Sequence, residues 1–207
     1  MRSKVLVEEI YEELRDEIIN LKMGEGTVIK EKDLAERFKV STTPVRDALS
    51  RLIFEGYVEK YPNQGYVVKP FSLKDYQDIF QYRRLLELAA IEIVCKRATD
   101  KELGDFQAEV MRDEQANRDG AQSADLNTEF HMKIARLTKN PFLIHSLENA
   151  INHTRRILLH DTHSFDYEFF KVPHDDIAGA IGRRNVPEAQ ELLQKHILDT
   201  QARILIR

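Results

Sequence analysis

The sequence predicts a mainly α-helical chain, with an N-terminal winged helix-turn-helix followed by an antiparallel six-helix bundle. Two observations predict this fold class. Residues 30–69 hold two short amphipathic helical patterns and then two strand patterns around a polar turn. After residue 72 the apolar residues recur only with helical spacing. Because 207 residues suit one large or two small domains, we divide the chain into residues 1–70 and 71–207.

An amphipathic helix is predicted over residues 5–21, and the glycines within residues 22–26 end it. Val28 and Ile29 follow as a short segment that is expected to pair with a later hairpin. The buried stripe of the first helix is expected to comprise Val5, Ile10, Leu14, Ile18 and Leu21.

Two short helices separated by a break at residues 39–40 are predicted next. The first covers residues 31–38. The second begins at a run of hydroxyl residues followed by Pro44, because proline lacks an N–H that would be unpaired in a first turn. Gly56 ends it. The two inward stripes comprise Leu34, Ala35 and Phe38, then Val45, Ala48, Leu49, Leu52 and Ile53.

A β-hairpin is predicted after the second helix, because strand formers at residues 57–61 and 66–68 flank a turn sequence. Its small polar tip suits contact with a phosphate backbone or a minor groove. Arginine on the second helix suits guanine edges and phosphates. The alternative is a small α+β domain with a solvated charged face. The outer face of the second helix would present Thr42, Thr43, Arg46, Asp47 and Ser50.

This stretch resembles the GntR family of bacterial transcription regulators over roughly residues 8–69. The motifs DLAERFKVSTTPVRDAL, LIFEGYVE and PNQGYVV carry the resemblance. The chain departs from the family pattern at Thr42, where arginine is usual. The resemblance implies a double-stranded DNA operator as partner, contacted by Lys32, Ser41, Thr42, Thr43, Arg46, Gln64 and Gly65.

The overall charge does not by itself indicate nucleic acid, because 31 basic residues face 35 acidic ones and the net charge is −4. DNA binding must then depend on local charge placement, which favours a homodimer. The chain has a single cysteine, Cys95, so internal disulfides are excluded. This thiol is expected to be buried within the fold, and the compartment of the protein is expected to be reducing. The sequence has neither a signal core nor an apolar run of ~20 residues, so a cytoplasmic protein is expected.

Six helical patterns follow a short linker at residues 69–72. Capping boxes at Thr99 and Asn185 mark two helix starts, and Asn140 before a proline marks a third. Six antiparallel helices form a bundle with room for a central site. The helices are predicted over residues 73–96, 100–117, 123–138, 141–160, 166–182 and 187–206.

Three histidines have positions that could bring them together inside the bundle. His131 shares a helix face with Asn127, His174 starts a helix with an apolar face, and His196 lies among apolar residues. Three imidazoles with an oxygen donor would hold a divalent ion. Hydrogen-bonded core histidines are the competing interpretation of the same spacing. Three further histidines are expected at the surface: His145, His160 and His163.

Residues 73–206 resemble the FCD ligand-binding domain of the FadR subfamily of GntR regulators. The motifs RRLLE, NTEFHMKIA, KNPFL, HDDIAGAI and AQELLQKHI carry this resemblance. It implies a divalent metal, zinc or nickel, with asparagine at a position where aspartate is common. Asp125 is the alternative oxygen donor. The implied ligands are Asn127, His131, His174 and His196.

The same resemblance implies that Arg83 pairs with a carboxylate of a small organic acid effector. An interhelix or surface salt bridge is the alternative role for this arginine. Four polar residues at helical spacing could line the pocket, although a solvated face explains them equally well. They are Asn149, Asn152, His153 and Arg156.

These expectations describe a dimeric transcription regulator that binds a pseudo-palindromic operator and responds to an organic acid bound at or near the metal. A regulator for which the metal itself is the signal is one alternative. A metal-dependent hydrolase is another. The hydrolase needs a general base, which the sequence does not offer at an obvious spacing, and it leaves the winged stretch unexplained.

Overall fold

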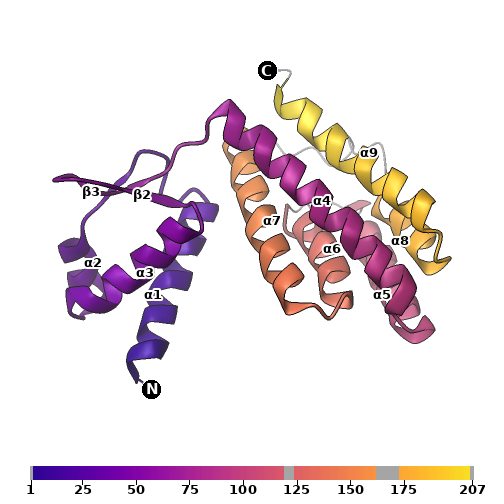
Figure 1. Cartoon of the computed structure of the whole chain (residues 1–207), viewed down its shortest axis with the longest axis horizontal. Helices are drawn as coiled ribbons and strands as arrows, with labels where there is room; N and C mark the ends of the chain where they lie inside the picture. Colours follow the sequence, from indigo (N-terminus) through magenta and orange to yellow (C-terminus); the bar gives the residue numbers. More distant parts are fainter. Residues whose placement is uncertain (1, 119–123, 162–172, 206–207) are drawn as a thin grey trace. The chain divides into compact units, whose positions relative to one another are not determined.

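The computed structural model describes residues 2–118, 124–161 and 173–205 of the chain. Two compact units, Met1–Ser72 and Leu73–Arg207, make it up. The first holds helices around one small antiparallel sheet and the second holds helices alone, in the residues described (Figure 1). The predicted fold class is therefore confirmed. Within the same described residues, no helix is both long and apolar enough to cross a membrane.

The N-terminal unit has the predicted order of elements. Its three strands lie in the order β1-β3-β2, and both pairings are antiparallel. The predicted pairing of Val28 and Ile29 is confirmed, with Val67 and Tyr66 as their partners. The elements are α1 (Arg2–Ile19), β1 (Val28–Ile29), α2 (Glu31–Phe38), α3 (Thr42–Phe54), β2 (Val58–Tyr61) and β3 (Gly65–Val68).

The ends of α2 and α3 follow local backbone chemistry. Lys39 ends α2 in the left-handed conformation at φ 56°, and the chain turns there towards α3. Ser41 occupies the N-cap of α3 with an extended backbone, but its side chain makes no capping hydrogen bond. Gly56 follows α3 with φ 82°, which glycine adopts without steric cost.

One apolar core holds the N-terminal unit together, and α1 packs against α3 within it. The predicted stripes of α1 and α3 supply seven of the fifteen buried residues of this core. Val5 and Ile53 are exceptions, because 57% and 36% of their surfaces are exposed. Leu21 is a third, since it follows the end of α1 and is only half-buried. The expectation that Val5 faces inward is wrong, since the step of five residues from Val5 to Ile10 places it about 140° around the helix from the buried face, while Leu6 and Val7 pack against the core.

The C-terminal unit is built around its longest helix, α4, which packs against α6, α7, α8 and α9 (Figure 1). The predicted capping box at Thr99 is present, since its N–H donates to Glu102 Oε2 at 2.9 Å. The predicted start at residue 166 lies outside the described residues, and the described helix begins at His174. The helices are α4 (Leu73–Arg97), α5 (Asp100–Arg118), α6 (Ala124–Leu137), α7 (Pro141–Asp161), α8 (His174–Gly182) and α9 (Val186–Leu205).

Candidate DNA interface and metal centre

The predicted DNA-contacting residues lie at the start of α2, at the start of α3 and at the tip between β2 and β3. Thr42 and Gly65 are half-buried there. The opposite face of α3 is buried in the core, so its outer face remains available to a duplex. The other predicted contacts are exposed: Lys32, Ser41, Thr43, Arg46 and Gln64.

Arg46 is held in a defined position by a neighbouring carboxylate. Its Nε donates to Glu31 Oε1 at 3.1 Å and its Nη2 donates to Glu31 Oε2 at 2.7 Å. Tyr66 on β3 also donates to Glu31 Oε1, at 2.8 Å. The hydrogen bonds from Arg46 and then from Tyr66 lower the pKa of Glu31 to about 2. Glu31, which was not among the predicted contacts, therefore joins α2 to α3 and to the wing, the hairpin formed by β2 and β3.

Gly65 is required by the backbone of the wing. Its φ is 97°, a conformation that residues with a side chain rarely adopt. A Cβ atom built on Gly65 would lie 2.9 Å from the carbonyl oxygen of Ile29. Close pairing of β1 and β3 therefore explains this glycine independently of its predicted DNA contact.

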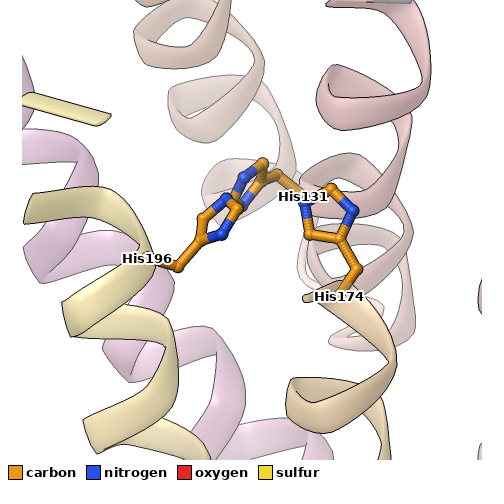
Figure 2. A group of neighbouring side chains, drawn as sticks. All are labelled: His131, His174 and His196. Carbon is orange, nitrogen blue, oxygen red and sulfur yellow. The ribbon is translucent and has the colours of Figure 1, made fainter. Parts of the chain in front are cut away.

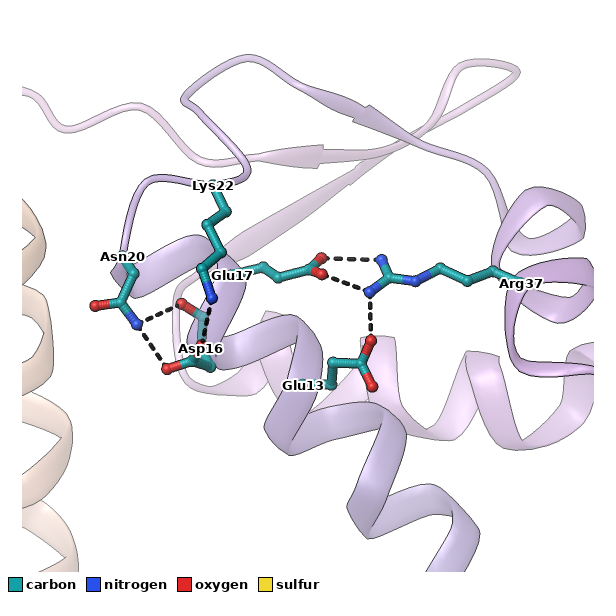
Figure 3. A network of polar contacts seen from close by, with 6 residues as sticks. All are labelled: Glu13, Asp16, Glu17, Asn20, Lys22 and Arg37. Carbon is teal, nitrogen blue, oxygen red and sulfur yellow. Dashed lines mark hydrogen bonds and ion pairs between the residues drawn. The ribbon is translucent and has the colours of Figure 1, made fainter.

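Two acidic residues of α1 form ion pairs with an arginine of α2. Arg37 on α2 forms ion pairs with Glu13 and Glu17, and its Nη1 donates to Glu17 Oε2 at 2.9 Å (Figure 3). Asp16 is bonded instead by Asn20 and Lys22 (Figure 3). Because both terminal nitrogens of Arg37 are used in these ion pairs, its positive charge is less available to phosphates.

Three buried imidazoles converge in the C-terminal unit, which we also call the helical unit (Figure 2). His131 lies on α6, His174 begins α8, and His196 lies on α9. One ring nitrogen from each can be chosen so that all three lie within 4.8 Å of one another. Nitrogens sharing one zinc ion lie at most about twice the 2.0–2.1 Å bond length apart, so this spacing is close to that of a metal site. Phe130 packs beside the cluster, with its ring centroid 4.0 Å from that of His174.

His131 is oriented by a buried carboxylate. Its Nδ1 lies 2.5 Å from Oε2 of Glu87, and the other oxygen of Glu87 accepts from Arg83 Nε at 2.5 Å. Burial and the positive charge of Arg83 lower the pKa of His131 to about 4, although Glu87 acts in the opposite direction. The neutral ring therefore donates from Nδ1. Its Nε2 is buried and has no hydrogen-bond partner among the described residues.

His174 is oriented by a second carboxylate. Its Nδ1 lies 3.0 Å from Oε1 of Glu114, and its backbone N–H donates to the same oxygen at 3.3 Å. A carboxylate only accepts, so Nδ1 is the donor, and Nε2 lies 3.1 Å from Oδ1 of Asn127. Nε2 of His174 and Oδ1 of Asn127 therefore lie side by side, as two ligands of one ion would.

This donor set fits a divalent metal. Imidazole nitrogens suit zinc or nickel, and the buried Nε2 of His131, which has no hydrogen-bond partner among the described residues, would be satisfied by such an ion. Glu87 and Glu114 hold the other nitrogens of His131 and His174, the arrangement that orients metal-binding histidines. The side chain of the alternative donor, Asp125, lies outside the described residues.

The predicted effector residues are divided between α4 and α7, which pack against each other. Arg83 is 2% exposed and is paired with Glu87, while its Nη2 has no hydrogen-bond partner among the described residues. Asn149 Oδ1 is likewise buried without a hydrogen-bond partner in that part of the chain. His153 and Arg156 are buried, so a solvated face does not describe them.

Glu87 and Glu114 were not predicted as parts of the site. Glu87 lies four residues after Arg83 on α4, a spacing at which opposite charges pair, so this signal was present. Glu114 offered none, because its partner His174 is 60 residues away in sequence. Of the histidines expected at the surface, His145 and His160 are exposed and His163 lies outside the described residues.

Comparison with known proteins assigns both units. Residues 6–68 match the bacterial regulatory proteins of the gntR family, and residues 78–199 match the FCD domain. Over 181 residues the chain is 33% identical to the Nta operon transcriptional regulator of Aminobacter aminovorans, which covers 83% of this chain and 81% of that protein. The chain belongs to the GntR family. This GntR-family member is accordingly a DNA-binding transcription regulator with an FCD domain, and its relatives are named as regulators rather than enzymes.

Solved structures share the fold of this GntR-family regulator. McbR/YncC of E. coli matches with a TM-score of 0.79 at 21% identity, covering 97% of both chains. A transcriptional regulator from Rhodococcus sp. RHA1, titled as a putative GntR protein, matches with a TM-score of 0.76 at 22% identity, covering 96% of this chain and 97% of that one. At these identities the similarity establishes the fold alone.

Proposed function

We propose that this GntR-family regulator changes its affinity for operator DNA when a small organic acid binds in the helical unit beside a divalent metal. The observation that supports this proposal is the position of the Glu87 carboxylate. It lies between Arg83 and His131, and each of these buried groups has one nitrogen without a hydrogen-bond partner among the described residues. Nη2 of Arg83 suits an anion, and Nε2 of His131 suits a metal ion.

The anion would bind to Arg83 Nη2. A buried donor without a partner raises the free energy of the empty site, and a carboxylate oxygen would satisfy it with a charge-assisted hydrogen bond. Because Glu87 already holds the Nε side of the guanidinium, Arg83 is fixed in place before the ligand arrives. Asn149 on the neighbouring helix α7 has a buried Oδ1 without a hydrogen-bond partner among the described residues, and we propose that it accepts from a hydroxyl of the ligand.

The metal would be held by His131, His174, His196 and Asn127. When bound, it supplies a positive charge that an oxygen of the organic acid can coordinate. Glu87 and Glu114 keep two of the imidazoles in the metal-binding tautomer. Because Glu87 contacts both His131 and Arg83, occupancy of the metal site and of the anion site is expected to be coupled, and this coupling is reciprocal.

Control of DNA binding requires that the ligand bind one arrangement of the regulator better than another, since equal affinity shifts no equilibrium. We propose that the regulator acts in the cytoplasm as a homodimer, with two winged units on a pseudo-palindromic operator. A metal-sensing regulator is the second candidate, because the three-histidine cluster is complete without Arg83. A hydrolase is not proposed, because the relatives are named regulators and the two carboxylates nearest the histidines are already hydrogen-bonded to them.

The two candidates are separated by titrating the full-length protein into a duplex that it selects from a random-sequence pool. Zinc or nickel is added alone, and then together with a panel of hydroxy acids and dicarboxylic acids, while fluorescence anisotropy measures operator affinity. The proposal predicts that affinity changes only when a metal and an acid are both present. A full change with metal alone supports the metal-sensing candidate and contradicts the organic acid as signal.

Arg46→Ala is expected to weaken binding to the selected duplex by ~1–3 kcal/mol, the loss typical of one well-placed arginine contact. The guanidinium is 55% exposed on the outer face of α3, and its Nη1 lies outside its pair with Glu31. Anisotropy titrations of wild type and variant measure the change. Arg51→Gln on the same helix is the control, because both terminal nitrogens of Arg51 donate to Glu8 of α1, whereas the pair of Arg46 leaves Nη1 outside it. Equal affinity of the Arg46→Ala variant and wild type would remove Arg46 from the interface.

A further inference from the structure

Glu31 is the one described carboxylate that is hydrogen-bonded both to the predicted DNA-contacting face of α3 and to the wing. It is the first residue of α2, it accepts two hydrogen bonds from Arg46 of α3, and it accepts one from Tyr66 of β3. Its side chain is 21% exposed, whereas that of Arg46 is 55% exposed. The carboxylate is therefore largely covered, and the arginine that it holds faces outward.

The two-point pair restricts Arg46 to a single orientation. Both bonds use the Nε and Nη2 side of the guanidinium, which directs Nη1 away from Glu31. A long arginine side chain otherwise samples many rotamers, and ordering it at the moment of binding opposes association. Tyr66 fixes the carboxylate in turn, and it is itself tied to Ile29 through strand pairing. The Glu31 carboxylate thus holds both Arg46 on α3 and Tyr66 on β3.

We propose that Glu31 is a positioning residue that determines DNA sequence specificity by holding Arg46 and the wing in one preformed arrangement. This inference rests on the proposed placement of Arg46 at the DNA. Glu31 does not contact DNA in this proposal, and it acts through Arg46 alone.

A negative charge beside a phosphate backbone weakens binding to any sequence by simple repulsion. Pairing with Arg46 and Tyr66 keeps the pKa of Glu31 low, at about 2, so the carboxylate carries this charge at neutral pH. If Glu31 acted only through its charge, its removal would strengthen binding to all duplexes alike. If it positions Arg46, its removal weakens binding to the preferred sequence and leaves binding to other sequences equal or stronger. The two roles therefore predict opposite results.

The test compares Glu31→Gln with wild type on two probes, a duplex selected by the wild-type protein from a random-sequence pool and poly(dI-dC). Affinity for the selected duplex is expected to fall about tenfold, the size of one good arginine contact, while affinity for poly(dI-dC) stays equal or rises. Glu36→Gln is the matched control, because it removes an exposed charge from the same helix. It should leave the ratio of the two affinities unchanged.

Two further variants keep the test decisive if Glu31→Gln destabilises the winged unit. Tyr66→Phe leaves the Arg46 pair in place and is expected to lower the affinity ratio less than Glu31→Gln does. In an Arg46→Ala background, Glu31→Gln should cause no further fall in the ratio, because the residue that it positions is absent. Thermal melting of each variant checks folding.

Three results would overturn the inference: an unchanged ratio in Glu31→Gln, stronger binding to both probes by the same factor, or an equal fall in ratio with and without Arg46. A wrong placement of Arg46 and a wrong role for Glu31 give different experimental results. If Arg46→Ala itself leaves operator affinity unchanged, the placement of Arg46 at the DNA is wrong. If Arg46→Ala weakens binding but Glu31→Gln does not lower the ratio, only the role of Glu31 is wrong.

Discussion

Glu87→Ala is expected to lower the free energy of unfolding of the helical unit by about 3–5 kcal/mol, the loss seen when one partner of a buried ion pair is removed. Glu87 is 1% exposed and Arg83 is 2% exposed, so the variant leaves a positive charge inside the protein with no compensating carboxylate. Nδ1 of His131 loses its partner at the same time. Urea unfolding of the full-length protein, followed through the helical signal, measures the change.

The same helix provides a control for this prediction. Glu92 and Lys96 form an ion pair with the same spacing as Arg83 and Glu87, but both are exposed, so Glu92→Ala is expected to leave stability unchanged within error. The double variant Arg83→Met with Glu87→Leu replaces the buried pair by apolar side chains and is expected to recover most of the lost stability. If Glu87→Ala behaves like Glu92→Ala, the buried pair is not the stabilising contact that its geometry indicates.

His174→Ala is expected to reduce metal binding strongly and to remove the stabilisation that the metal provides. A ligand present at 100 times its Kd stabilises the folded state by about 2.7 kcal/mol, so the wild-type protein should lose this amount when the metal is removed with a chelator. The variant should lack this response to the chelator. Elemental analysis of purified protein and melting temperatures with and without zinc measure the two effects.

His174 also stacks on Phe130, so its replacement has a cost unrelated to metal. The difference between melting temperatures with and without zinc separates the two contributions, because only the metal-linked part depends on zinc. His145→Ala is the control, since His145 is exposed on α7. If the His174→Ala variant retains the metal content and the zinc response of the wild-type protein, the histidine cluster is not the metal site.

Much of the fold could be predicted from local patterns. The boundaries of α2 and α3 followed from a break at Lys39 and a stop at Gly56, because a left-handed backbone and a glycine both act within a few residues. The capping box at Thr99 was predictable for the same reason. Val5 was misplaced because it does not share the face of Ile10, Leu14 and Ile18, although its neighbours Leu6 and Val7 pack against the core.

The candidate site was only partly predictable. The FCD resemblance indicated three histidines and Asn127, and the structure brings these side chains together. The two carboxylates that orient them were not predicted. Nothing local distinguishes Glu114 from the other acidic residues of α5, and the contact of Glu87 with His131 spans 44 residues.

The sequence by itself therefore determined the order of helices and strands, the family, and the residues at which DNA and metal contacts are expected. Only the tertiary structure decided that Glu31 holds Arg46 and that Glu87 joins Arg83 to His131. Helix caps and periodic apolar stripes depend on residues three or four positions away, so they can be predicted from the sequence. The charge of a buried side chain depends on which distant segment of the same unit lies against it, and this is fixed only when that unit folds.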